Sequence, residues 1–106
     1  MALLSVKVLE YVDDGYPGWV RAVFNDANGK EWSIVDKTVY FEGYDELGKD
    51  SIYPQPNQIE CRVIGEREGT DNRRILLIDI EVPNGLNAED GTTKFEFSSD
   101  QINERE

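Results

Sequence analysis

The sequence predicts an all-β fold, a small antiparallel barrel or sandwich of five to six strands. Apolar and polar residues alternate with a period of two along most of the chain, and the period of 3.6 residues that is typical of an amphipathic helix is missing. Short segments rich in Gly, Asn and Asp separate these alternating stretches, as they do between antiparallel strands. The length of 106 residues fits one domain, so we expect residues 1–106 to form a single β-domain.

The first three strands are predicted at residues 3–12, 19–25 and 30–35. Each has one apolar face, as a half-buried strand requires. These faces are formed by Leu4, Val6, Val8 and Val12, by Val20, Ala22 and Phe24, and by Trp32 and Ile34. Asn28 and Gly29 predict a two-residue hairpin turn between the second and third strands, because glycine adopts positive φ at little cost.

The middle of the chain is predicted to be irregular. Residues 38–42 are expected to continue the third strand after a bend, and residues 43–58 form the longest stretch without alternation. Within it, Pro54 and Pro56 argue against a central strand, because proline cannot donate a backbone hydrogen bond. A fourth strand is expected at residues 59–68.

The last third of the chain predicts a second hairpin turn, followed by strands at residues 73–82 and 92–97. The run from Ile75 to Ile78 is apolar on both faces, which is typical of a strand in the middle of a sheet. Residues 98–106 form a polar C-terminal tail, which is expected to be frayed or to form one weak helical turn.

The composition excludes several kinds of active site. The chain has no histidine, which removes Ser-His-Asp and Cys-His nucleophiles and histidine-ligated zinc. Its single cysteine, Cys61, can form neither an internal disulfide nor a thiolate zinc cage, and it shares an apolar strand face with Ile59 and Val63. We therefore expect an inert, buried thiol, no metal or cofactor, and no enzymatic activity.

The charge balance points to a class of partner. There are 22 acidic and 11 basic residues, which gives a net charge of −11. Nucleic acids and anionic membranes are bound through Lys and Arg, so we expect a basic protein partner instead. Lys7 and Glu10 interrupt the N-terminal apolar segment, no stretch of about 18 apolar residues occurs, and the thiol is free, so a soluble cytoplasmic protein is expected.

Aromatic and acidic side chains gather near the turns of the first half, and they define a candidate binding surface. Tyrosine and tryptophan at the ends of loops can anchor an interface, and carboxylates can occupy a cationic cleft on a partner. The alternative is that these aromatic residues close the end of a barrel while the acids only keep the loops solvated. The proposed surface carries Asp13, Asp14, Tyr16, Trp19, Glu42, Tyr44, Asp45, Glu46 and Asp50.

Residues 16–20, 25–32, 35–37, 51–56 and 59–61 resemble a set of small, poorly characterised bacterial proteins of about this length. This resemblance covers most of the chain from residue 16 to residue 82. In size and acidity the chain is also similar to the immunity partners of bacterial toxins, including those of contact-dependent inhibition systems. Neither resemblance assigns a role to any residue.

Three functions follow, in order of preference. The first is a non-enzymatic immunity or inhibitor protein that neutralises a basic toxin, such as a nuclease, by covering its active site or substrate groove. The second is a small-ligand or peptide-binding β-barrel, which requires a deep cavity lined by aromatic residues. The third is a carboxylate-based hydrolase, which requires two carboxyl groups in one concave pocket.

Overall fold

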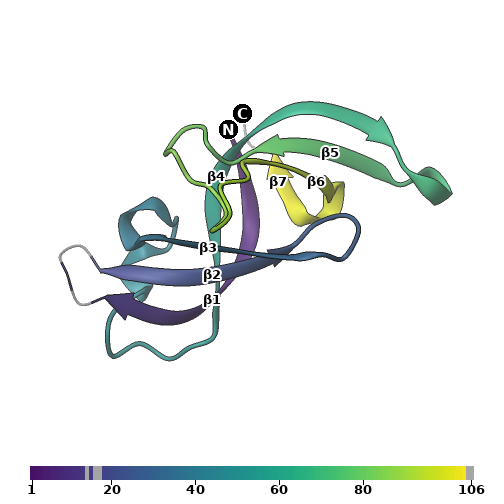
Figure 1. Ribbon diagram of the computed structural model, residues 1–106. Helices are drawn as coiled ribbons and strands as arrows, with labels where there is room; N and C mark the ends of the chain where they lie inside the picture. Colours follow the sequence, from purple (N-terminus) through teal and green to yellow (C-terminus); the bar gives the residue numbers. More distant parts are fainter. Residues whose placement is uncertain (14, 16–17, 105–106) are drawn as a thin grey trace.

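The described part of the chain folds into seven antiparallel strands, which form one curled half-barrel sheet (Figure 1). This computed structural model describes residues 1–13, 15 and 18–104. The strand order is β3-β2-β1-β4-β5-β6, with β7 paired to β1. The predicted fold class is confirmed. The strands are β1 (Ala2–Asp13), β2 (Trp19–Asn25), β3 (Glu31–Lys37), β4 (Gln55–Glu68), β5 (Arg74–Asp79), β6 (Lys94–Ser98) and β7 (Ile102–Glu104).

The helical segments of the described residues are four short 3-10 turns. They are η1 (Thr38–Tyr40), η2 (Tyr44–Glu46), η3 (Thr70–Asn72) and η4 (Ser99–Gln101). None of the described helices has the length and apolar character needed to cross a membrane. The predicted continuation of β3 through residues 38–42 is wrong, because η1 turns the chain away after Lys37 and only Phe41 returns to a bridge with Ile59.

Strand β1 is the centre of the sheet. It pairs with β4 through Ala2–Val8, with β7 through Ala2–Leu4, and with β2 from Lys7 onward. The β2 register shifts after Val8, where Leu9 is an extra residue, and such a bulge reverses the faces of the residues that follow. The predicted core position of Val12 is therefore wrong: Tyr11 packs against the core, and Val12 is 44% exposed.

The β2–β3 hairpin has a three-residue loop. Asp26 N donates to Lys30 O (2.9 Å), and Gly29 N donates to Asp26 O (3.0 Å), which makes a tight turn closed by Gly29. The positive φ predicted for Gly29 is confirmed at 81°. The predicted two-residue turn is wrong, since it requires positive φ at Asn28 as well, and Asn28 does not have it.

The Asp26 carboxylate ties this loop to the strand that follows. Its Oδ1 accepts hydrogen bonds from the backbone N–H of Asn28 (2.8 Å) and Lys30 (3.0 Å), and its Oδ2 accepts one from Trp32 Nε1 (2.9 Å). Partial burial raises the pKa of Asp26, but the hydrogen bonds from Trp32, Lys30 and Asn28 outweigh it and leave the pKa below its ordinary value.

We expect Asp26→Asn to flatten the acid side of the stability profile. Because the folded-state pKa is lowered, the ionised carboxylate contributes stability above its unfolded pKa of about 4, and this contribution is lost as the pH falls through the folded value. The variant should be about 1 kcal/mol less stable than the wild type at pH 7, since the group is half-exposed, and this difference should disappear in acid. Urea unfolding of both proteins at pH 7 and below pH 4 measures this difference in the free energy of unfolding. A difference that is as large below pH 4 as at pH 7 would contradict the prediction.

The structure differs from the prediction at two places in the second half of the chain. Pro56 lies inside β4, opposite Lys7 of β1, although a strand was not expected there. Proline is tolerated because β4 pairs with β5 only from Arg62 onward, so the other side of β4 has no strand at Pro56. Residues 99–101 form the helical turn expected for the tail, capped by Ser98 and Gln101, but the prediction missed β7, in which the buried Ile102 begins a strand that pairs with β1.

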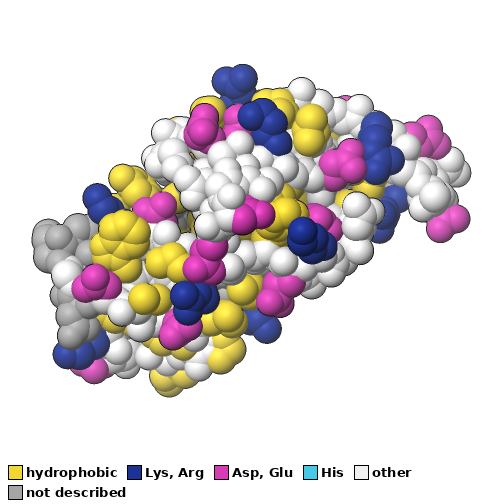
Figure 2. All heavy atoms as spheres, viewed as in Figure 1, with side chains coloured by type: hydrophobic (Ala, Val, Ile, Leu, Met, Phe, Trp, Pro, Cys, Tyr) yellow, Lys and Arg dark blue, Asp and Glu magenta, His cyan; other side chains and the backbone are white. Residues whose placement is uncertain are grey.

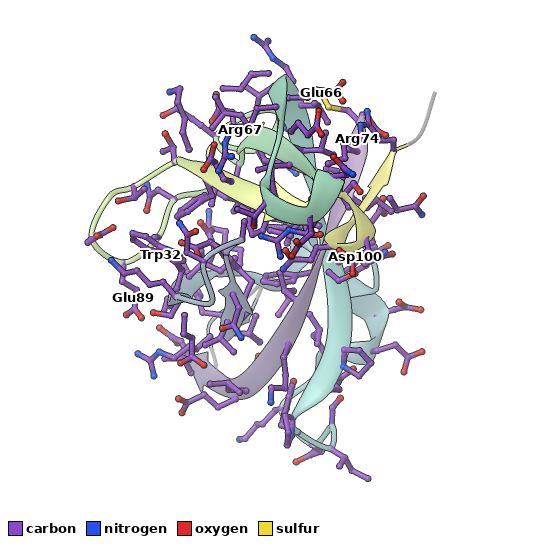
Figure 3. All side chains as sticks on the ribbon, turned by 90° about the vertical axis from the view of Figure 1, so that its right-hand side faces the viewer. Trp32, Glu66, Arg67, Arg74, Glu89 and Asp100 are labelled. Carbon is purple, nitrogen blue, oxygen red and sulfur yellow. The ribbon has the colours of Figure 1, made fainter. Side chains whose placement is uncertain are left out.

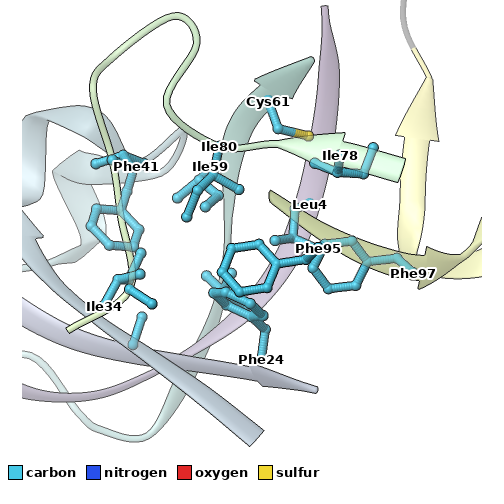
Figure 4. Close-up of a cluster of buried hydrophobic side chains, with 14 of the residues drawn as sticks. Leu4, Phe24, Ile34, Phe41, Ile59, Cys61, Ile78, Ile80, Phe95 and Phe97 are labelled. Carbon is cyan, nitrogen blue, oxygen red and sulfur yellow. The ribbon is translucent and has the colours of Figure 1, made fainter. Parts of the chain in front are cut away.

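An aromatic cluster within the mostly aliphatic core closes the open side of the half-barrel (Figure 4). The ring centroids of Phe24 on β2 and Phe95 on β6 lie 5.2 Å apart, and those of Trp32 on β3 and Phe95 lie 4.9 Å apart. Ala27 N donates to Glu96 O (2.7 Å) beside these rings. The two ends of the sheet path, β3 and β6, are thus joined mainly by side chains. The apolar faces predicted for Phe24 and Trp32 agree with this arrangement, and Phe95 and Phe97 are buried beside them.

Candidate functional site

The candidate surface lies at the end of the molecule opposite the β4–β5 hairpin (Figure 1). At this end Asp13 and Trp19 are opposite one another on β1 and β2, and Trp19 is opposite Lys37 on β3. The Lys37 Nζ lies 5.9 Å from the centroid of the Trp19 ring. Asp14 and Tyr16, which belong to the predicted surface, lie outside the described residues.

The other predicted residues lie in the connection between β3 and β4. Tyr44, Asp45 and Glu46 form η2, while Asp50 follows in an exposed loop. Glu42 is exposed directly before this turn. The backbone hydrogen bond from Thr38 N to Gly18 O (2.9 Å) places η1 beside the start of β2. The structure therefore brings the described members to one end.

This connection is held to the sheet by specific hydrogen bonds. The Asn57 side chain accepts a hydrogen bond from Gly43 N (3.0 Å) and donates one to Gly43 O (3.1 Å). Gln55 Nε2 donates to Glu46 O (3.0 Å), and Tyr53 Oη donates to Gly48 O (2.7 Å). Tyr53 is thus a packing residue under the loop. The backbone of η2, which carries the acidic side chains, is therefore held in place by hydrogen bonds from β4.

A small hollow combines aromatic and acidic side chains at this end. Its volume is about 130 Å³. Two of its residues, Glu42 and Tyr44, belong to the predicted surface. The lining residues are Val39, Tyr40, Phe41, Glu42, Tyr44, Glu60 and Asn84.

Sequence reasoning missed Glu60 and Asn84 as parts of this hollow. Glu60 follows the buried Ile59 on β4, and alternation assigned it only to the solvent face. Asn84 belongs to the turn after β5, and no local pattern connects that turn with η1 or η2. The hollow unites residues from three distant parts of the chain, so only the sheet topology could have revealed it.

Exposed hydrophobic side chains accompany the acids. Val39 is 49% exposed, Tyr44 is 56% exposed and Ile52 is 87% exposed. Figure 2 shows hydrophobic side chains gathered on the half of this face that β1, β2 and β3 form. Exposed apolar groups beside polar ones are typical of a protein-interaction surface.

Cys61 is a core residue. It is fully buried, and its Sγ lies 3.6 Å from the backbone oxygen of Ala2. Burial raises the pKa of the Cys61 thiol to about 12, so the reactive thiolate is scarce at neutral pH.

We expect Cys61→Ala to lower the free energy of unfolding by about 1–2 kcal/mol, because it removes a buried sulfur and leaves a small cavity. The native thiol should also react with a disulfide reagent only as fast as the protein unfolds. Urea titration and the rate of thiol labelling measure the two effects. Rapid labelling of the folded protein would contradict the assignment of Cys61 to the core.

The described residues contain no group of three or more Cys, Asp or Glu side chains that could hold a metal ion. The 130 Å³ hollow is also smaller than the ~300 Å³ at which small-molecule pockets begin. A larger hollow of about 420 Å³ lies at the other end of β1, between Met1, Arg62 and Glu104, and has no aromatic lining. Comparisons of the chain with protein-family models, with curated proteins and with solved structures found no match.

Proposed function

We propose that this protein is a non-enzymatic binding domain that holds a basic protein partner at the end formed by η1, η2 and the start of β2. The observation that carries the proposal is the hollow of about 130 Å³, in which two tyrosines and two glutamates meet. A hollow of this size suits one side chain of a partner, and its chemistry suits a cationic one.

The lining explains this preference for a cation. Tyr40 and Tyr44 line the hollow, and aromatic rings attract an ammonium or guanidinium group; Glu42 and Glu60 add negative charge to the same lining. Val39 supplies an apolar surface for the methylene groups of a lysine or arginine. Together these groups match the whole length of such a side chain.

The surrounding acids extend the same preference over a wider surface. Asp45, Glu46 and Asp50 are exposed on the segment that carries the hollow, and Asp13 lies at the end of β1. Such a surface complements a cleft that binds phosphate groups, because carboxylates can occupy the phosphate positions. This supports an immunity or inhibitor protein that covers the active site of a basic toxin such as a nuclease. The free thiol of Cys61 supports a reducing location such as the cytoplasm.

Charge reversal of the three loop acids tests the proposal. The partner is first captured from the source cells on the immobilised protein and identified, and its kinetics are then measured by surface plasmon resonance. The triple variant Asp45→Lys, Glu46→Lys, Asp50→Lys should associate about tenfold or more slowly at low salt, with a weaker effect at high salt.

A matched control reverses three exposed acids elsewhere, Glu31→Lys, Glu68→Lys and Asp100→Lys, and should change association much less. Tyr44→Ala should instead speed dissociation by about 30-fold, as expected for an interface anchor. Circular dichroism confirms that each variant is folded. If the triple variant and its control associate equally at both salt concentrations, this end of the molecule is not the binding surface.

A further inference from the structure

The chain contains two Asn-Gly pairs, Asn28-Gly29 and Asn84-Gly85. An asparagine followed by glycine can lose its side-chain nitrogen as ammonia without an enzyme, because glycine has no Cβ to keep its backbone nitrogen away from the amide carbon of the asparagine. The product carries a carboxylate in place of the amide. The structure holds the two pairs with different firmness, and this difference selects one of them as a site of modification.

The turn that carries Asn28 is fixed from several sides. Asp26 Oδ1 accepts a hydrogen bond from Asn28 N (2.8 Å), and Gly29 N, the nitrogen that has to attack, donates to Asp26 O (3.0 Å). Ala27 N donates to Glu96 O on β6 (2.7 Å), and β2 and β3 are paired directly on either side of the turn. Release of Gly29 N therefore requires several hydrogen bonds to break together.

The turn that carries Asn84 has fewer contacts. Gly85 N donates to Glu81 O (2.6 Å), and this hydrogen bond closes the turn after β5. Residues 80–93 form neither helix nor strand, and Figure 3 shows this connection, which carries Glu89, as a loop outside the strands. Glu81 and Gly85 are exposed, so the hydrogen bond that holds the attacking nitrogen breaks in a local opening that leaves the strands paired.

The surroundings of Asn84 and Gly85 also suit the reaction. A Cβ atom built on Gly85 would meet no atom within 4 Å outside its two chain neighbours, and the residue is exposed to water. Asn84 is half-buried at the side of the hollow, and its amide has no hydrogen-bond partner among the described residues. The amide can therefore turn toward Gly85 N without breaking a hydrogen bond.

We propose that Asn84, rather than Asn28, is a site of spontaneous deamidation, which adds a carboxylate to the lining of the hollow. Gly85 N attacks Asn84 Cγ, and the new C–N bond closes a succinimide ring. The side-chain nitrogen leaves as ammonia and takes the proton from Gly85 N. Water then adds to one of the two ring carbonyls and opens the ring, which gives aspartate or isoaspartate.

The reaction makes the hollow more acidic as the protein ages. Glu42 and Glu60 already line it, so its acidic groups increase from two to three. A third carboxylate strengthens the attraction of the hollow for a cationic group. The inference goes beyond the proposed function and does not depend on it, because the reaction needs only Asn84, Gly85 and water.

Mass spectrometry of the full chain tests the proposal. Folded protein kept in warm, mildly alkaline buffer should gain one dalton with time, while its net charge changes from −11 to −12. Peptide mapping should place the change at Asn84, as aspartate and isoaspartate. Asn28 should react several times more slowly than Asn84 in the folded protein, and at a similar rate in guanidinium chloride, where neither turn exists.

Asn84→Gln is the matched variant, because glutamine keeps the amide but places its carbon one bond farther from Gly85 N and closes a ring much more slowly. It should remove most of the mass gain of the folded protein, whereas Asn28→Gln should leave that gain unchanged. Circular dichroism confirms that both variants are folded.

Three results would overturn the proposal. The first is an Asn84 that stays unchanged in the folded protein. The second is an Asn28 that reacts as fast as Asn84 before the chain is unfolded. The third is an Asn84→Gln protein that gains mass as fast as the wild type.

Discussion

Replacement of Phe97 by alanine is expected to lower the free energy of unfolding by about 3–5 kcal/mol, the range for loss of a buried phenylalanine. The Phe97 ring is fully buried and packs against Phe24, with 5.6 Å between the ring centroids. Phe97 also stands opposite Leu76 of β5, so its removal leaves a cavity between β2, β5 and β6. The neighbours are held in strands and can close the cavity only in part.

Urea unfolding followed by circular dichroism measures this loss, with Tyr44→Ala as the control. Tyr44 is 56% exposed, so its truncation should change stability by less than about 0.5 kcal/mol. A Phe97→Ala protein as stable as the Tyr44→Ala protein would show that β6 does not belong to the core.

Gly18→Ala is expected to destabilise the protein by about 1–3 kcal/mol through overpacking. Gly18 is buried, and a Cβ atom built on it falls well inside contact distance of the ring and hydroxyl of Tyr11. Tyr11 packs against the core, so its ring must move when the methyl group is present. The backbone of Gly18 has ordinary φ, and the effect is therefore steric.

A double-mutant cycle separates this contact from other causes. In a Tyr11→Ala background the space over Gly18 is empty, so Gly18→Ala should cost less than about 0.5 kcal/mol there. Equal costs in both backgrounds would mean that Tyr11 does not cover Gly18. Thermal or urea unfolding of the four proteins gives the coupling energy.

The sequence was sufficient to predict most strands because a period of two is a local signal. Val20, Ala22 and Phe24 are all buried, as alternation predicts for β2. The same reasoning failed at Val12, because one extra residue at Leu9 reverses the alternation and leaves no trace in residue type. It missed β7 because three residues are too few to show a period.

The candidate site was predictable only in part. Glu42 and Tyr44 belong to a segment whose acidic and aromatic composition is visible in the sequence. Both residues line the hollow. Glu60 and Asn84 reach it from β4 and from the turn after β5, through pairings between residues far apart in the chain. Local composition carries no information about such pairings.

The pairing of β1 with strands that are distant in the sequence determines when the sheet can form during synthesis. This strand is synthesised before its partners Gln55–Cys61 and Ile102–Glu104, which follow about 50 and 100 residues later. Until then its Leu4 and Val6 have only part of the surface that buries them in the finished sheet. Contacts of such long sequence separation slow folding, because the connecting loops must be ordered before the pairing stabilises anything. The nascent chain therefore holds an apolar, incompletely paired strand until β7 has been synthesised, and during this interval the strand is most exposed to aggregation and to chaperones.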